Sequence, residues 1–371
     1  MGEAALGTSN VNQVGYLLGG PKRATISTTT REPASWQLVT DDDVVTLAGV
    51  AVPFGAPAGQ TQIIDFSDFD VEGNYRLRVK TDHFADSAQF EIGSNLYDGL
   101  LFDVLDNFSQ NRVEFVEDYA LATAQLLGIV EREQRLGNDT GSGSVADLAI
   151  AEAKQLLSQM LAGQAGGVNA SDLALAAVAA QMARLTVGAE PEYANQLVSA
   201  AEIGYAAAKA EVNSDDAELY WAAVELYLTT GDEAYLHDLR HSPFHHSAFH
   251  LIDTKDRNEI AEWARLQLAL VTSDLPERQE IIAGLSLAAD LLLEARSPYD
   301  LLVSPVDLLA NAILIAGAEE ATLEEKYLDA ALAGIDYLAG RNPNGVNYLS
   351  ENSLKHPAAL ALLLAYISNE G

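Results

Sequence analysis

The segment DYLAGRNPNGVNY, residues 336–348, is the stretch of this 371-residue chain that says most about its fold. It places a turn rich in Gly, Asn and Pro directly after an apolar helical pattern near the C-terminus. Glu351 follows three residues after Tyr348, so an acidic side chain stands just beyond the turn. The apolar stretch 358–367 is too short to cross a bilayer and indicates a core helix.

The composition restricts the partners of the chain. Asp and Glu number 54 against 21 Lys and Arg, and the net charge of -33 repels nucleic acid and anionic membranes. Such a surface suits a neutral polysaccharide or oligosaccharide. The chain has no cysteine, so its stability must come from packing. No apolar run is long enough for membrane insertion, and the N-terminus MGEAALGTSN lacks the regions of a signal peptide, so we expect a processed or trimmed chain.

The sequence of residues 1–93 predicts a β-sandwich domain. Short β-rich runs are separated by Pro and Gly, and Tyr75, Leu77 and Val79 alternate with polar residues. This spacing is typical of an antiparallel sandwich. The expected strands lie at residues 24–30, 35–40, 44–52, 61–67, 74–80 and 88–93.

The sequence of residues 94–371 predicts an all-α domain. Apolar residues recur three and four apart in Ala- and Leu-rich segments, which predicts about twelve helices grouped as six hairpins. Periodicity alone leaves a closed toroid and an open solenoid as alternatives. The expected helices begin near Asn95, Asp118, Ser144, Ala170, Pro191, Asp216, Asp232, Lys255, Pro276, Pro305, Leu323 and Leu354.

Several motifs resemble the cellulase-like family 9 glycoside hydrolases, in the family's order and over nearly the whole chain. They include VNQVGY at 11–16, IDFSDFDVEGNYRLRV at 64–79, ELYWAAVELYLTTGDEAY at 218–235 and the turn at 336–348. The resemblance implies an Ig-like domain packed on an (α/α)6 barrel, with a groove for β-1,4-glucans such as cellulose. It also implies inverting hydrolysis by two carboxylates roughly 6.5–9.5 Å apart.

The same resemblance names candidate site residues. Glu351 matches the family's catalytic acid by its distance from the last helix, and a solvated loop glutamate is the alternative. Asp118, followed by Tyr119, matches the end of the family's Asp-Ala-Gly-Asp-Tyr segment that carries the base, and a helix N-cap is the alternative. We also expect Tyr119, Arg341 and Tyr348 to bind substrate.

Departures from the family pattern argue against ordinary cellulase action. Phe115 replaces the first aspartate of the base segment, and the long loops before Asp118 and before Glu351 are almost absent. We therefore expect impaired or lost hydrolysis. The alternative is a non-catalytic structural, self-assembling or glycan-binding protein. Either would be extracellular or on the cell surface, with the periplasm also open.

Two segments of the sequence have residues spaced as in metal-binding sites. The segment NSDDAELYWAA resembles one that supplies oxygen ligands to a structural calcium, with Asp216, Glu218 and Asp253 as the expected ligands; helix N-capping is the alternative for the aspartate. No cofactor is required. Five histidines between His237 and His250 show metal-like spacing, but a proline interrupts them and no known zinc motif is complete.

Overall fold

The computed structural model describes residues 9–28, 32–54, 61–80, 84–115, 118–138, 141–162, 172–250, 258–294, 304–350 and 354–368. The β-strands of these ranges precede all the helices. They are β1 (Ser9–Asn10), β2 (Gly15–Leu17), β3 (Arg23–Ser27), β4 (Ser35–Thr40), β5 (Val45–Val50), β6 (Val52–Phe54), β7 (Thr61–Asp65), β8 (Gly73–Lys80), β9 (Phe84–Asp86) and β10 (Phe90–Gly93).

The strands form two sheets packed face to face. One has the order β1-β3-β7-β6, and the other β2-β10-β8-β4-β5 with β9 also paired to β8. The pairing of β2 with β10 is parallel, and the others are antiparallel. Tyr16, Trp36, Phe66 and Phe90 meet between the sheets, with Tyr16 edge-on to both Phe66 and Phe90. The predicted sandwich is confirmed.

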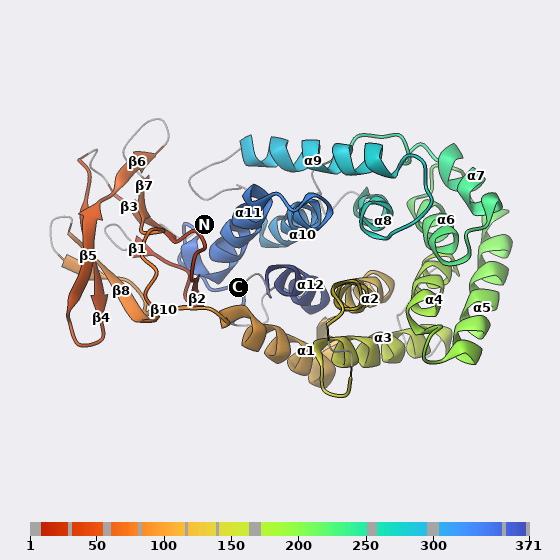
Figure 1. The fold of residues 1–371 in the computed structure, drawn as a ribbon, viewed down its shortest axis with the longest axis horizontal. Coiled ribbons are helices and arrows are strands. Elements are labelled where there is room, and N and C mark those ends of the chain that lie inside the picture. Colours follow the sequence, from red (N-terminus) through yellow and green to blue (C-terminus); the bar gives the residue numbers. More distant parts are fainter. Residues whose placement is uncertain are drawn as a thin grey trace.

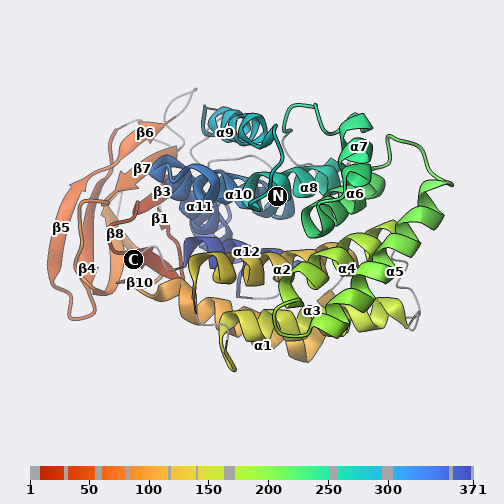
Figure 2. The ribbon, with the colours of Figure 1, turned by 45° about the vertical axis from the view of Figure 1, so that its right-hand side comes forward.

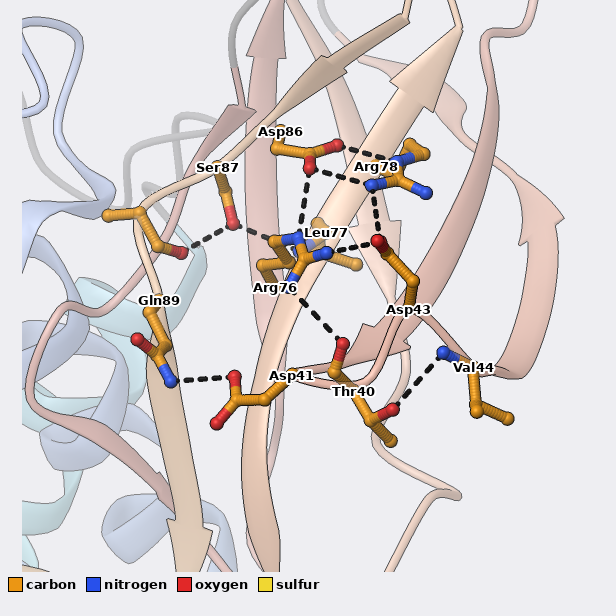
Figure 3. A network of polar contacts seen from close by, with 11 residues as sticks. Thr40, Asp41, Asp43, Val44, Arg76, Leu77, Arg78, Asp86, Ser87 and Gln89 are labelled. Atoms are coloured by element: carbon orange, nitrogen blue, oxygen red, sulfur yellow. Dashed lines mark hydrogen bonds and ion pairs between the residues drawn. The ribbon is translucent and has the colours of Figure 1, made fainter.

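A network of ion pairs joins neighbouring strands on the outer face of the larger sheet (Figure 3). The Asp86 carboxylate accepts from Arg76 Nε at 2.9 Å and from Arg78 Nε at 2.8 Å. Asp43, in the β4–β5 turn, pairs with both arginines. Since these pairs are partly exposed, they fix the register of two hairpins more than they add stability.

Twelve α-helices lie in the described residues, with starts close to those predicted. The helices are α1 (Leu96–Phe115), α2 (Tyr119–Leu136), α3 (Val145–Leu161), α4 (Asp172–Thr186), α5 (Pro191–Lys209), α6 (Ala217–Thr230), α7 (Glu233–His241), α8 (Asn258–Leu270), α9 (Arg278–Glu294), α10 (Pro305–Thr322), α11 (Glu325–Asp336) and α12 (Pro357–Ile367), with a π-helical turn η1 (Tyr337–Arg341) after α11.

Successive helices alternate between the inside and the outside of a closed ring. Figure 1 shows α1, α3, α5, α7 and α9 along the outside, and Figure 2 shows the sheets at one side of the helical part. Helices α10 and α12 are buried around most of their surface, whereas α5 buries only one face. Because α12 contacts both α2 and α10, the ring closes, and the predicted toroid rather than a solenoid is confirmed.

Side-chain caps explain many of the helix starts. Asp118, Ser144, Asp216, Asp232 and Ser304 each precede a helix and accept a hydrogen bond from a backbone N–H of its first turn. Such caps satisfy donors that the helix itself cannot. No helix among the described residues is both long and apolar enough to cross a bilayer.

Buried ion pairs close one end of the toroid, near the C-terminal ends of the inner helices. Arg132 of α2 pairs with Glu320 of α10. Arg184 of α4 lies 3.0 Å from Glu131 of α2 and 3.0 Å from Glu225 of α6. Since each charge has an opposite partner, these side chains link the inner helices and fill this end.

The 336–348 turn joins the toroid to the sandwich through a buried polar network. The Asn12 amide donates to the Tyr97 hydroxyl at 3.0 Å and to the Asp336 carboxylate at 2.9 Å. Gln13 N–H donates to the carbonyl of Ala339 at 2.9 Å. Gly340 has φ +127°, and a Cβ there would lie 2.6 Å from the Gln13 side chain, so only glycine fits.

We expect Asn12→Ala to lower the free energy of unfolding by about 3 kcal/mol, because the buried Asp336 and Tyr97 each lose a hydrogen bond. Urea unfolding followed by circular dichroism measures this. Asn74→Ala, at an exposed position of β8, is the matched control and should change stability by less than about 0.5 kcal/mol. Equal effects of the two substitutions would contradict the role of the network.

Candidate active site

The end of the toroid opposite the ion pairs is acidic. The inner helices run in the same direction, because each hairpin reverses the chain twice, so their N-terminal ends meet at this mouth. Each of five inner helices brings a carboxylate to its first turn or cap. These residues are Asp118 of α2, Asp172 of α4, Asp216 of α6, Glu259 of α8 and Asp307 of α10.

Asp118 is exposed and serves as the N-cap of α2. One carboxylate oxygen, Oδ1, accepts from Leu121 N–H at 2.9 Å. The other oxygen has no hydrogen bond to the described residues. The neighbouring Tyr119 is half-buried against the helical core, and its carbonyl accepts from the Thr123 hydroxyl. Asp118 therefore combines the capping role with an oxygen available to a ligand.

Glu259 is an acidic residue at this mouth that sequence reasoning did not single out. It lines a cavity of about 20 Å³ together with Gln125 of α2 and Trp263 of α8. Burial, together with the nearby Asp118 and Asp307 carboxylates, which act in the same direction, raises the pKa of Glu259 to about 7. At neutral pH this carboxyl therefore holds a proton for much of the time. An acidic residue in a first turn is common for dipole reasons, so no local signal separates Glu259 from the others.

Arg341 and Tyr348, both expected to bind substrate, differ in their surroundings. Arg341 is 2% exposed, with Nε 3.7 Å from Asp336 and Nη2 donating to the Ala333 carbonyl. Tyr348 is half-buried, and its N–H donates to the Leu338 carbonyl at 2.7 Å. Arg341 is thus a member of the buried junction between the domains. The substrate role of Tyr119, Arg341 and Tyr348 stays a prediction.

Glu351 lies outside the described residues. The residues on either side of it, Ser350 and Leu354, line a cavity of about 240 Å³ whose other wall is the face of α1 that carries Asp103 and Asn107. This cavity is lined by both polar and apolar side chains. The role of Glu351 stays a prediction.

The expected calcium ligands do not all fall in the described structure. Asp216 caps α6 by accepting from Glu218 N–H and Leu219 N–H, while Asp253 lies outside the described residues. Within the described ranges, no three or more His, Cys, Asp or Glu side chains are arranged to hold a metal ion. The calcium site stays a prediction.

The histidine-rich segment does not converge on one point. His237 and His241 stack on each other on α7 at 4.0 Å, whereas His245 is buried 3.3 Å from the Tyr220 hydroxyl. Burial lowers the pKa of His245 to about 4, and the neighbouring His246 acts in the same direction. His245 is therefore neutral at physiological pH and serves as a packed core residue.

Comparison with known protein families agrees with this architecture. Residues 162–362 match the family model described as glycosyl hydrolase family 9, and residues 9–83 match the cellulase N-terminal Ig-like domain. The chain belongs to glycosyl hydrolase family 9.

Two curated proteins are similar to this family 9 chain. Endoglucanase C of Cellulomonas fimi is 27% identical over 481 residues, covering 92% of this chain and 43% of that protein. The Cellulose 1,4-beta-cellobiosidase of Acetivibrio thermocellus is 33% identical over 108 residues, covering 28% of this chain and 12% of that protein. The chain thus spans less than half the length of these relatives. Since the first alignment is longer than the whole chain, that relative carries insertions that this chain lacks.

Solved structures share the fold of this family 9 chain. A metagenome-derived family 9 endoglucanase superimposes with a TM-score of 0.78 at 16% identity, covering 97% of this chain and 99% of that chain. A family 9 protein of Bacteroides ovatus gives a TM-score of 0.75 at 16% identity, covering 97% and 98%. At this identity the likeness establishes the Ig-like domain and the (α/α)6 barrel.

We expect Asp118→Ala to lower the free energy of unfolding by about 1 kcal/mol, and Asp118→Asn to leave it nearly unchanged, because asparagine also caps helices. Denaturant unfolding measures both. Asp216→Ala removes the equivalent cap from α6 and should cost a similar amount. Equal losses for Asp118→Asn and Asp118→Ala would show that the charge, and not the cap, stabilises α2.

Proposed function

We propose that this chain is a family 9 scaffold for β-glycans whose hydrolytic turnover is weak or lost. The chemistry would be inverting, with Asp118 activating water and a carboxylic acid protonating the departing oxygen; likeness assigns the acid role to Glu351. The substrate would be a neutral β-linked polysaccharide or oligosaccharide, met at the cell surface or outside the cell. A structural calcium near Asp216 belongs to the same proposal, and no other cofactor is required.

The observation that carries the proposal is the shortness of the two segments that flank the mouth. Helix α1 ends at Phe115 and α2 begins at Tyr119, so residues 116–118 alone connect them. Residues 342–356 alone connect η1 with α12. Few side chains are left to hold successive sugar rings, and the relative's insertions support the same conclusion. Because positioning contributes many orders of magnitude to rate, two carboxylates without a groove make a poor catalyst.

We expect a reducing-sugar assay on soluble β-glucans and chitosan oligomers to find turnover that is slow or undetectable in the wild type. Glu351→Gln and Asp118→Asn should remove whatever activity remains, because they remove the acid and the base. Robust turnover that either substitution abolishes would refute the proposal of an impaired enzyme.

A second candidate function, self-assembly, is favoured by the exposed valines of the sandwich. Strands β5 and β6 are edge strands of the two sheets, and consecutive in the chain. Val45, Val50 and Val52 on these strands are 45%, 64% and 63% exposed. An edge strand with exposed apolar residues is able to pair with another chain.

If the edges mediate assembly, light scattering should show oligomers that grow as salt screens the net charge of -33. Replacing both Val50 and Val52 with Lys should shift the protein toward monomer, because lysine blocks edge pairing. Val71→Lys, at a position 55% exposed and outside the strands, is the control. A wild type that stays monomeric across the salt series would exclude assembly.

A further inference from the structure

A second cavity lies at the end of the toroid that the buried ion pairs close, away from the acidic mouth. Its volume of about 420 Å³ is within the usual range for small-molecule sites. Its walls come from the end of α6, the start of α7 and the segment that follows α8. Both α7 and α8 contact α6, and Figure 1 shows the three helices side by side. Packed elements therefore define the shape of this cavity.

Two carboxylates at this cavity are free. Glu233, in the first turn of α7, and Asp274, in the α8–α9 connection, both line it, and neither side chain makes a hydrogen bond or ion pair with the described residues. The Arg240 guanidinium also lines the cavity, but Glu277 already accepts from its Nε at 2.5 Å and its Nη2 at 2.8 Å. The unbalanced charge at the cavity is therefore negative.

Helix structure explains only one of these carboxylates. An acidic residue in a first turn, such as Glu233, is common because it lies at the positive end of its own helix dipole. Asp274 belongs to no helix, and its carboxylate accepts no hydrogen bond from a described backbone group. The C-terminal ends of α6 and α8, at Thr230 and Leu270, reach the same end of the toroid, and their carbonyl groups add to the negative potential. This potential favours a cationic ligand.

Two hydroxyl groups at the cavity also lack a partner among the described residues. Tyr227 of α6 lines the cavity and is 7% exposed, yet its hydroxyl makes no hydrogen bond there. The Oγ atom of Ser273 is buried and likewise unpaired. Burial and then the Glu233 and Asp274 carboxylates raise the pKa of Tyr227, as expected for a hydroxyl that faces both acids. Buried polar groups without partners indicate a ligand or water that completes them.

We propose that this cavity binds a small organic molecule that carries a primary ammonium group, held between Glu233 and Asp274. An ammonium group has three donors and no acceptor. The two carboxylates and the Tyr227 hydroxyl oxygen are three acceptors in the wall of one cavity. The Ser273 hydroxyl is left for a hydroxyl of the ligand body, so an amino sugar has the required groups. The site goes beyond the proposed function, because it is separate from the mouth.

Two other ligand classes fit the cavity less well. A metal ion needs several converging ligands, and in the described part of the chain no three His, Cys, Asp or Glu side chains are arranged to hold one. A neutral sugar suits the volume and the hydroxyl groups, but it forms no ion pair with Glu233 or Asp274. Glucosamine and glucose differ only in the amino group at one carbon, so comparing them isolates the contribution of the ammonium group.

We expect glucosamine to bind the wild-type protein about tenfold more tightly than glucose, because each exposed ion pair contributes up to about fivefold. Calorimetric titration at about pH 6, where the amine is charged, measures both affinities. A background of about 0.15 M NaCl screens the general attraction of a chain of net charge -33 for cations. Equal affinities for the two sugars, or glucosamine binding that does not saturate, would overturn the inference.

Three substitutions locate the site. Glu233→Gln and Asp274→Asn should each weaken glucosamine binding about fivefold, because each removes one charge. Tyr227→Phe changes no charge and should weaken binding by about three- to tenfold, because it removes one hydrogen bond. Glu192→Gln is the matched control and should leave binding unchanged, since Glu192 is also an exposed first-turn residue of an outer helix, α5, but does not line the cavity.

The control separates a defined site from general charge attraction. If Glu192→Gln weakens binding as much as Glu233→Gln, or if Tyr227→Phe leaves binding unchanged, the acidic surface at large holds glucosamine and the inference fails. Thermal unfolding shows that each variant is folded, and a rise in Tm with glucosamine that Asp274→Asn diminishes is the second readout. No step needs turnover of a glycan, so the ammonium site and the impaired hydrolase stand or fall independently.

Discussion

The buried hydrogen bonds of Asn12 to Asp336 and Tyr97 are the interaction on which the rest of the structure depends. They tie the segment between β1 and β2 of the sandwich to the first toroid helix and to the end of α11. A carboxylate as buried as Asp336 is stable only with such donors around it. The network therefore sets the path of the chain from α11 into the turn, and from there to α12, which closes the ring.

The two ends of the toroid have opposite electrostatic character. At one end Arg132 and Arg184 neutralise the glutamates around them, and these ion pairs connect neighbouring inner helices. At the other end the N-terminal ends of the inner helices carry acidic side chains with few cationic partners among the described residues. The positive ends of the helix dipoles lower the cost of this gathering of negative charge. Burial raises the pKa of Glu259, one of these acidic side chains.

Particular residues show how far sequence reasoning reached. The helix starts at Ser144, Asp216 and Asp232 were predictable because a cap and its first turn are local. Asp118 caps α2, which is the alternative that its position at a helix start offered, and its catalytic role stays a prediction. Arg341 shows the limit, because its motif gave no sign that the side chain is buried beside Asp336 at the junction of the domains. The position of Glu259 at the mouth could not be predicted from the sequence, since outer helices such as α9 also begin with acidic residues.

The sequence by itself determined the two-domain plan, the strand and helix positions and the family, because alternation, capping and motif spacing act over a few residues. Only the tertiary structure decided that the ring is closed, that one end is ion-paired and that Glu259 lies in the electrostatic field of Asp118 and Asp307. The physical reason is distance along the chain. Side chains more than a hundred residues apart meet only when every intervening helix hairpin has packed, and no local pattern encodes that meeting.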